Sequence, residues 1–199
     1  MRTYINYVNV YNFDELSDSA KERVKNDYLD DECRKDIFEE NCMFKLHELL
    51  PSSDLNIEYS LCYCQGDGFN IYGEVYFNDL IEVLKDKFSE KEMKFLQWAF
   101  KETGIDSYIM KNNRHYAYCI ADTYNFMEDI ADALSYYNMK NIKVDILDKM
   151  NREAKSFFYN LCKEFENCGY NFFYEISDEE VEEWADINNF EFTADGIIF

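Results

Sequence analysis

The chain has 199 residues and a formal net charge of −21, which results from 20 basic and 41 acidic side chains. Hydrophobic residues make up 47% of the sequence, with 17 Tyr and 17 Phe, and this excludes a disordered chain because disorder combines high charge with few aromatic residues. The strong negative charge argues against direct binding to DNA, RNA or an anionic membrane, since such binding requires clustered Lys and Arg.

The N-terminal quarter of the sequence predicts one strand followed by two helices. Residues 3–12 alternate between polar and apolar side chains with the period of a strand. Ser17 or Ser19 is then expected to cap a helix, because the residues after Ser19 match a capping box. A second helix is predicted over 31–50, where apolar side chains recur at helical spacing and Pro51 follows as a stop signal.

A β-hairpin is the clearest strand signal in the sequence. Residues 57–63 and 69–77 carry apolar side chains at alternate positions, which places these side chains on one face of each strand. An Asp-Gly pair between the two runs is expected to supply the positive φ angles of a tight turn. Without a following helix N-terminus or a lysine, the same residues are a poor phosphate-binding loop. The predicted turn residues are Gln65, Gly66, Asp67 and Gly68.

The rest of the chain is predicted to be mainly helical. Helices are expected at 79–87, at 89–103 with Ser89 as its cap, at 124–138, in a long segment that ends at Asn167, and at 177–188. Gly169 is expected to close the long helix, because glycine tolerates the left-handed C-cap conformation. Further strands are expected at 105–110, 114–122 and 170–175 and in a terminal hairpin over 190–199.

These elements together predict an α+β fold, in which a mainly antiparallel sheet of hairpins packs with several helices. Hairpins and helices follow one another without the regular alternation that produces a parallel sheet. Because no linker rich in Pro, Gly and Ser is visible, we expect a single acidic domain over 1–199.

The acidic residues concentrate in the C-terminal part of the chain. The last 36 positions contain 11 Asp and Glu and no Lys or Arg. On the helix predicted at 177–188, five carboxylates occupy an arc of about 140°, while Val181, Trp184 and Ala185 fall on the opposite side. Counting Glu180 as well, six carboxylates over roughly 13 Å of helix are one per ~2 Å, which approaches the charge density of duplex DNA.

A solvated face of an amphipathic helix explains this pattern in the simplest way, but such helices usually mix charges of both signs. An acidic face without Lys suits docking onto a basic groove, with tyrosines on the non-core face of the hairpin as further anchors. The predicted partner-binding residues are Asp178, Glu179, Glu182, Glu183, Asp186, Tyr72 and Tyr76.

The cysteines and histidines form no recognisable catalytic or metal-binding pattern. Seven cysteines and no visible signal peptide predict free thiols in a reducing cytoplasm, and no apolar run is long enough to span a membrane. Cys62 and Cys64 point to one face of a strand, but no second close pair exists and the only histidines are His47 and His115. We therefore predict no catalytic residue, no metal and no cofactor, and a protein that is not an enzyme.

Three stretches carry a resemblance: FDELS at 13–17 with Ala20-Lys21, YCQGDG at 63–68, and a C-terminal run from Ser177 through NNFEFT to Asp195-Gly196. In this order they resemble a family of small acidic bacteriophage and prophage proteins, some of which are labelled antitoxin-like. The resemblance implies a bacterial host cytoplasm as the setting and brings no catalytic residues. Residues 89–151 lie outside it and are a candidate insertion specific to this protein.

Charge and resemblance together predict a phage-encoded, non-enzymatic inhibitor of a host nucleic-acid-targeting defence complex, of the anti-CRISPR or antirestriction type. The expected partner is a basic host protein or ribonucleoprotein, such as a CRISPR effector or a restriction enzyme, bound through a surface that mimics nucleic acid. Two alternatives stay open, namely an antitoxin-like protein that neutralises one toxin and an enzyme with an unrecognised Cys or metal site.

Overall fold

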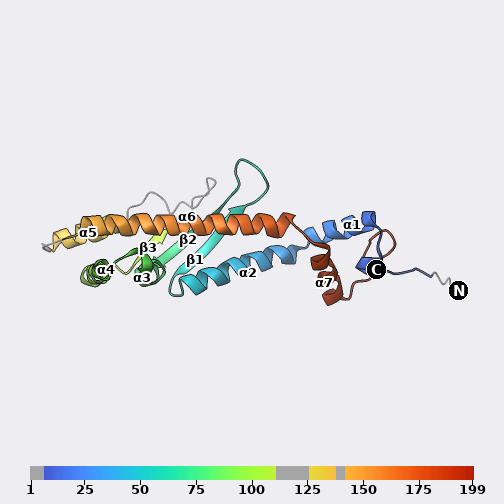
Figure 1. The fold of residues 1–199 in the computed structure, drawn as a ribbon, viewed down its shortest axis with the longest axis horizontal. Helices are drawn as coiled ribbons and strands as arrows, with labels where there is room; N and C mark the ends of the chain where they lie inside the picture. The colour runs from blue at the N-terminus through green and yellow to red at the C-terminus, as the bar shows by residue number, and fades with distance from the viewer. Residues whose placement is uncertain (1–6, 111–125, 138–141) are drawn as a thin grey trace, which may run out of the picture. The chain divides into compact units, whose positions relative to one another are not determined.

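The computed structural model of the chain describes residues 7–110, 126–137 and 142–199. The chain forms two compact units (Figure 1). The terminal unit combines residues 1–38 with 170–199, and the central unit consists of residues 39–169. The predicted α+β fold with an antiparallel sheet is confirmed. The single domain over the whole chain stays a prediction.

The central unit contains the sheet, whose strands are β1 (Asp54–Ser60), β2 (Gly68–Tyr76) and β3 (Ser107–Met110). All neighbours are antiparallel, in the order β1-β2-β3. The predicted hairpin is confirmed, because Ser60 pairs with Gly68 at its closed end. Its alternating apolar side chains turn to the core, where Phe69, Ile71 and Val75 are buried.

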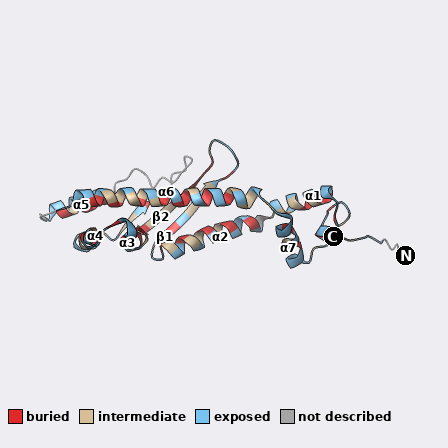
Figure 2. Cartoon of the chain, viewed as in Figure 1, coloured by how far each residue is buried: buried red, intermediate tan, exposed pale blue. Residues whose placement is uncertain are grey.

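Helices make up most of the remaining chain, and their predicted positions are largely confirmed. Buried and exposed residues alternate along α2 (Glu32–Leu49) and α6 (Val144–Tyr174), as expected of helices with one face in a core (Figure 2). No helix in the described part of the chain is both long and apolar enough to cross a membrane. Helices α2 and α6 belong in part to the terminal unit as well. The helices of the central unit are α2 (Glu32–Leu49), α3 (Phe77–Leu84) with the short η2 (Lys85–Lys87), α4 (Glu90–Thr103), α5 (Phe126–Tyr136) and α6 (Val144–Tyr174).

Helix α4 begins with the predicted capping box. The Glu92 carboxylate accepts hydrogen bonds from the backbone N–H and the hydroxyl of Ser89, both at 2.7 Å, and from Lys149 Nζ of α6 at 2.9 Å. The Ser89 backbone bond, the Ser89 hydroxyl bond and then Lys149 lower the pKa of Glu92 from 4.5 to about 2. The cap therefore also ties α4 to α6 while Glu92 is ionised.

The stability of the protein should depend on pH through Glu92. Because the folded pKa is about 2 against 4.5, the stabilisation is complete above pH 4.5 and is lost as the pH falls towards 2. In the Glu92→Gln variant, urea titrations between pH 2 and 6 should give a flatter dependence of the unfolding free energy on pH. Glu102→Gln, at an exposed position of the same helix without these bonds, should keep the wild-type slope. Equal slopes in wild type and Glu92→Gln would contradict the prediction.

The terminal unit packs a short η1 (Phe13–Glu15) and α1 (Asp18–Leu29) against α7 (Asp178–Asn188). Ser17 rather than Ser19 is the N-cap of α1, since its hydroxyl accepts a hydrogen bond from the Ala20 N–H. The small apolar core of this unit consists of Phe13, Leu16, Ala20, Val24, Val181, Ala185 and Phe192.

The long helix α6 continues past its predicted stop. Gly169 is buried inside the helix instead of closing it. The rings of Phe172 and Phe173 pack on Phe38, with ring centroids 5.7 and 5.1 Å away. This aromatic packing outweighs the roughly 1 kcal/mol that a glycine costs inside a helix. The predicted strand over 170–175 is therefore wrong.

Arg34 stabilises the C-terminal end of α6. Its guanidinium group lies between the rings of Tyr28 and Phe172, 4.1 and 4.5 Å from their centroids, and donates a hydrogen bond to the Phe172 carbonyl. That carbonyl is one of the last four of the helix, which lack partners inside the helix. A cation at this end is also favoured by the helix dipole.

The strand predicted over 3–12 is wrong for its described part, 7–12. Only Tyr11 pairs there, through two 2.9 Å backbone hydrogen bonds with Phe192. The described residues before it, 7–10, pair with no strand, so the alternating pattern alone does not make a strand there. The predicted short terminal hairpin is present: Phe192 and Ile198 form an antiparallel bridge, and backbone hydrogen bonds from Phe199 to Glu191 and from Thr193 to Ile197, both 2.8 Å, lie on either side of it. The strand predicted over 114–122 lies outside the described residues.

Candidate functional site

Helix α7 carries the predicted acidic residues, and its orientation agrees with the sequence pattern. Val181 and Ala185 are buried in the core of the terminal unit, and Trp184 is half-buried beside them. Trp184 is held by an indole N–H bond to Asp31 at 3.2 Å. The carboxylates on the other side of the helix are exposed, and four of them are called the acidic face below: Glu179, Glu182, Glu183 and Asp186.

The two ends of α7 are fixed by local hydrogen bonds. Ser177 caps the N-terminus and accepts the Glu180 N–H at 3.2 Å, and the Glu180 carboxylate accepts the Ser177 N–H at 3.0 Å. Asn189 ends the helix in the left-handed conformation, with φ of 54°. Acids in the first turn also suit the positive end of the helix dipole. Glu180 therefore belongs to the N-terminal cap. The cap and Asn189 together fix both ends of the helix that carries the acidic face.

Asp178 differs from the other predicted acids because it has basic partners. Its carboxylate lies 2.6 Å from Lys25 Nζ and 4.0 Å from Lys21 Nζ, both on α1. The hydrogen bond from Lys25 lowers the pKa of Asp178. The expectation that no Lys pairs with these acids is thus wrong for Asp178, because its partners come from the other end of the sequence. This residue links α7 to α1.

The acidic face itself makes no ion pair with any basic side chain in the part of the chain that the structure describes. No described basic side chain therefore balances these four neighbouring carboxylates on one side of α7. Ile187, one turn after Glu183 on the same helix, is 71% exposed and adds an apolar side chain to this surface.

The predicted tyrosine anchors are carried by the sheet and not by α7. Tyr72 and Tyr76 are half-buried on β2, opposite in direction to its buried residues. The backbone N–H of Tyr76 donates to the Ser53 hydroxyl at 3.1 Å, at the point where β2 ends and α3 begins. Both tyrosines belong to the central unit, whereas the acidic face belongs to the terminal unit.

The conformation of the loop between β1 and β2 is fixed by hydrogen bonds to the Asp67 side chain and not by positive φ angles at its glycines. The buried Asp67 carboxylate accepts the backbone N–H groups of Cys62 and Cys64 at 2.7 and 3.0 Å and the Ser60 hydroxyl at 3.2 Å. The only positive φ in this loop, 54°, is at Tyr63. The expected turn with positive φ at Asp67 and Gly68 is therefore wrong, because the side-chain bonds fix a wider loop.

Removal of the Asp67 carboxylate should destabilise the central unit. Asp67→Ala removes the acceptor of the Cys62 and Cys64 N–H groups and of the Ser60 hydroxyl, and the loss of these bonds should lower the unfolding free energy by about 2 kcal/mol. Asp106→Ala, at an exposed position before β3, should change the unfolding free energy by less than about 0.5 kcal/mol. Urea titrations of both variants test the prediction, and similar small losses in the two would show that the Asp67 bonds contribute little.

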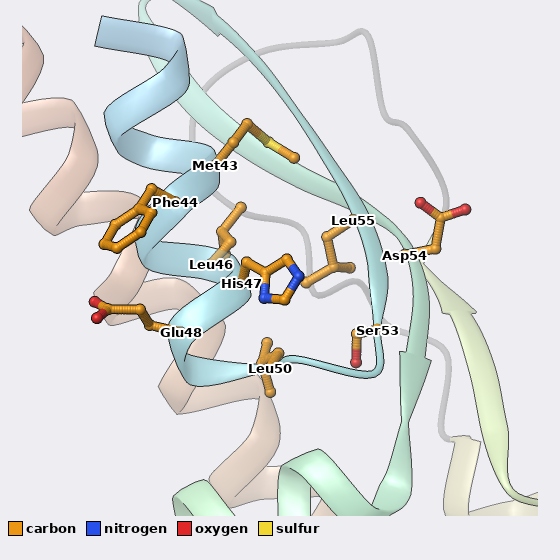
Figure 3. Close-up of a pocket in the computed structure, with 9 residues that line it drawn as sticks. All are labelled: Met43, Phe44, Leu46, His47, Glu48, Leu50, Ser53, Asp54 and Leu55. Carbon is orange, nitrogen blue, oxygen red and sulfur yellow. The ribbon is translucent and has the colours of Figure 1, made fainter.

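A groove that the sequence did not predict lies on the central unit (Figure 3). Its volume is about 500 Å³, and it opens between the last turns of α2 and the first residues of β1. In Figure 3, Leu46 and His47 lie between α2 and β1, and Leu55 points back towards them. The helical spacing of α2 indicates a buried face, but no residue pattern indicates that part of this face stays open. The lining residues are Met43, Phe44, Leu46, His47, Glu48, Leu50, Ser53, Asp54 and Leu55.

The cysteines give no support to a catalytic or metal site within the described residues. No group of three or more His, Cys, Asp and Glu side chains there is arranged to hold a metal ion. Burial, followed by the nearby Cys168, raises the pKa of the Cys42 thiol to about 12, which makes it a poor nucleophile. Cys64 donates its thiol to Asp67 at 3.1 Å, so this thiol belongs to the loop bonding described above.

The acidic face is the arrangement that gathers most of the predicted binding residues. It presents four carboxylates on one exposed side of a capped helix, next to an ion pair at Asp178. Such a surface attracts a cationic surface by charge complementarity. Compared with models of protein families, with curated proteins and with solved structures, the chain matches none.

Proposed function

We propose that this protein is a non-enzymatic inhibitor that binds the basic groove of a nucleic-acid-binding partner through the acidic face of α7. The observation that carries this proposal is that the four carboxylates of the face have no basic partner among the described residues, although Lys21 and Lys25 pair with Asp178 at the start of the same helix. If α7 had no binding role, Lys side chains among these carboxylates would stabilise the helix through i,i+4 ion pairs.

The proposed mechanism is competition with nucleic acid for the partner's groove. A fixed row of carboxylates can occupy the positions that phosphates take, and the net charge of −21 steers a basic protein towards it. The cap at Ser177 and the buried Val181 and Ala185 keep the row from rearranging, so little ordering entropy is lost on binding. Inhibition would then be stoichiometric and would weaken as salt screens the charges.

The proposed setting is a bacterial host in which a phage protein blocks a nucleic-acid-targeting defence complex. Support for it comes from the phage-like stretches at 13–17, 63–68 and 177–196, together with the strong negative charge. The groove of a CRISPR effector or a restriction enzyme has the basic character that the acidic face requires.

Affinity capture from a bacterial host lysate tests the proposal. The full chain should retain a basic nucleic-acid-binding protein at low salt, lose most of it at high salt, and release it to added DNA or RNA. Mass spectrometry identifies what is retained. Capture of one small toxin that nucleic acid does not displace would favour the antitoxin alternative. Recovery of no nucleic-acid-binding protein at moderate salt would overturn the proposal.

A further inference from the structure

Two exposed cysteines lie two positions apart in the loop between β1 and β2. Because β1 ends at Ser60, Cys62 and Cys64 belong to this loop and not to a strand, as the sequence predicted. Both residues are exposed, and neither forms a disulfide. Tyr63 between them is 69% exposed. A small oxidant in solution can therefore reach this segment, and two neighbouring thiols can react with each other as well as with the oxidant.

The backbone of the loop brings the two cysteines to the separation that a disulfide spans. The N–H groups of Cys62 and Cys64 donate to the same Asp67 oxygen, Oδ2, at 2.7 and 3.0 Å. Tyr63 has φ of 54°, and this left-handed conformation turns both N–H groups towards one acceptor, as in an anion-binding nest. A residue with helical angles of either hand places the Cα atoms of its two neighbours about 5.5 Å apart. Disulfides join Cα atoms that are about 4.4–6.8 Å apart.

The Asp67 carboxylate fixes this arrangement from inside the fold. Asp67 is 6% exposed, and its other oxygen, Oδ1, accepts the Cys64 thiol at 3.1 Å and the Ser60 hydroxyl at 3.2 Å. The carboxylate thus orients the backbone of both cysteines and the thiol of one. Because this backbone is already ordered in the reduced protein, closing a disulfide costs less conformational entropy here than in an unfolded chain.

We propose that Cys62 and Cys64 are a reversible redox pair that closes to a disulfide on reaction with an oxidised low-molecular-weight thiol such as glutathione disulfide. The Cys62 thiolate attacks one sulfur of glutathione disulfide, forms a mixed disulfide and releases one glutathione thiolate. The Cys64 sulfur then attacks the Cys62 sulfur and releases the second. Two electrons pass to glutathione disulfide, and the two cysteine protons pass through water to the glutathione thiolates.

The pair is a modification site that goes beyond the function proposed above. It belongs to the central unit, whereas the acidic face belongs to the terminal unit. Closing the disulfide removes the Cys64 thiol as a donor to Asp67, while the two backbone N–H bonds remain. A reductant such as dithiothreitol restores both thiols.

A single tryptic peptide reports on the pair. Cleavage after Lys45 and Lys85 gives residues 46–85, which contain Cys62 and Cys64 and no other cysteine. The full chain is equilibrated with reduced and oxidised glutathione, quenched with acid, alkylated, digested and measured by mass spectrometry. The disulfide should appear as a peptide that is two hydrogen atoms lighter and carries no alkyl group. A peptide that only gains glutathione, or that is cross-linked to a second copy, would overturn the proposal.

Cys33 is the matched single thiol on the same chain. It is exposed, and the tryptic peptide 26–34 contains it alone. With reduced glutathione held at ~1 mM, the pair should be half oxidised at about tenfold less glutathione disulfide than half modification of Cys33 requires, because the second step of the pair is intramolecular. Equal requirements would show that Cys62 and Cys64 react as two separate thiols, and the proposal would be wrong.

Unfolding shows whether the loop structure creates the pair. In concentrated urea the chain loses the Asp67 bonds, so half oxidation of Cys62 and Cys64 should require about tenfold more glutathione disulfide than in the native protein. The requirement of Cys33, measured in the same samples, corrects for any effect of urea on thiol reactivity. If the native and unfolded chains need the same concentration after this correction, the spacing in the sequence accounts for the reaction, and the loop is not a built redox site.

Discussion

Gly73→Ala should lower the unfolding free energy by about 3–5 kcal/mol, which is enough to unfold many small domains. Gly73 lies inside β2 and pairs with Leu55 of β1 and with Met110 of β3. Its φ of +128° is a conformation that residues with a Cβ rarely adopt. A Cβ at this position would lie 2.2 Å from the Asp54 carbonyl oxygen and 3.0 Å from the Leu55 Cα, so the backbone of β1 would have to move.

Gly104→Ala is the matched control for this prediction. Gly104 ends α4 with φ of +69°, and a Cβ there would meet no atom within 4 Å. This variant should lose only the cost of a left-handed Ala, about 1–2 kcal/mol. Urea titrations of both variants separate the clash from the backbone conformation. Equal losses in the two variants would show that the backbone of β1 moves aside at no cost in free energy, so that the clash expected at Gly73 is absent.

Local signals in the sequence were sufficient for most of the helices and for the hairpin. Ser89 with Glu92 predicts the start of its helix because a capping box depends only on residues three positions apart, and the structure has the same kind of box at Ser177 and Glu180. Strand alternation also identified the buried residues of β2, such as Ile71. Elements whose stability comes from nearby residues are therefore predictable without the fold.

The incorrect predictions depend on contacts that are distant in sequence or on an unexpected use of a side chain. Gly169 resembles a helix stop, but Phe38 and Arg34, more than a hundred positions away, stabilise the next turn of α6. Asp67 resembles a turn residue with positive φ, yet it acts through its carboxylate. In each case the local propensity is real but another interaction outweighs it: a tertiary contact at the end of α6, and hydrogen bonds from the Asp67 side chain to neighbouring backbone groups in the loop.

The candidate site, too, has one part that the sequence predicts and one part that it does not. The acidic side of α7 follows from helical periodicity, because Val181 and Ala185 mark the buried side of the helix. The pairing of Asp178 with Lys25 could not be predicted, since the two residues meet only when α1 and α7 pack. The pairing distinguishes Asp178, which links α7 to α1, from the four carboxylates of the acidic face, which make no ion pair with a described residue.

Reversal of the acidic face should weaken partner binding about a hundredfold or more at low salt and leave the fold intact. The four residues of the face, Glu179, Glu182, Glu183 and Asp186, are changed to Lys in this variant. Each change replaces an attraction to a basic groove with a repulsion, and such charge effects combine at one interface. The fold should survive because Val181, Ala185 and the Ser177 cap are untouched. Lys at position 179 opposes the helix dipole, but this costs only a few tenths of a kcal/mol.

A second variant with the same net charge decides whether the position of the acids matters. It changes four exposed acids on other elements to Lys: Asp86, Glu102, Asp106 and Glu128. Binding to the partner recovered by affinity capture is measured for both variants over a salt series. If the acidic face is the interface, the control keeps most of the wild-type affinity and salt dependence, whereas the reversed face loses both. Equal losses in the two variants would mean that the total charge, and not this face of α7, attracts the partner.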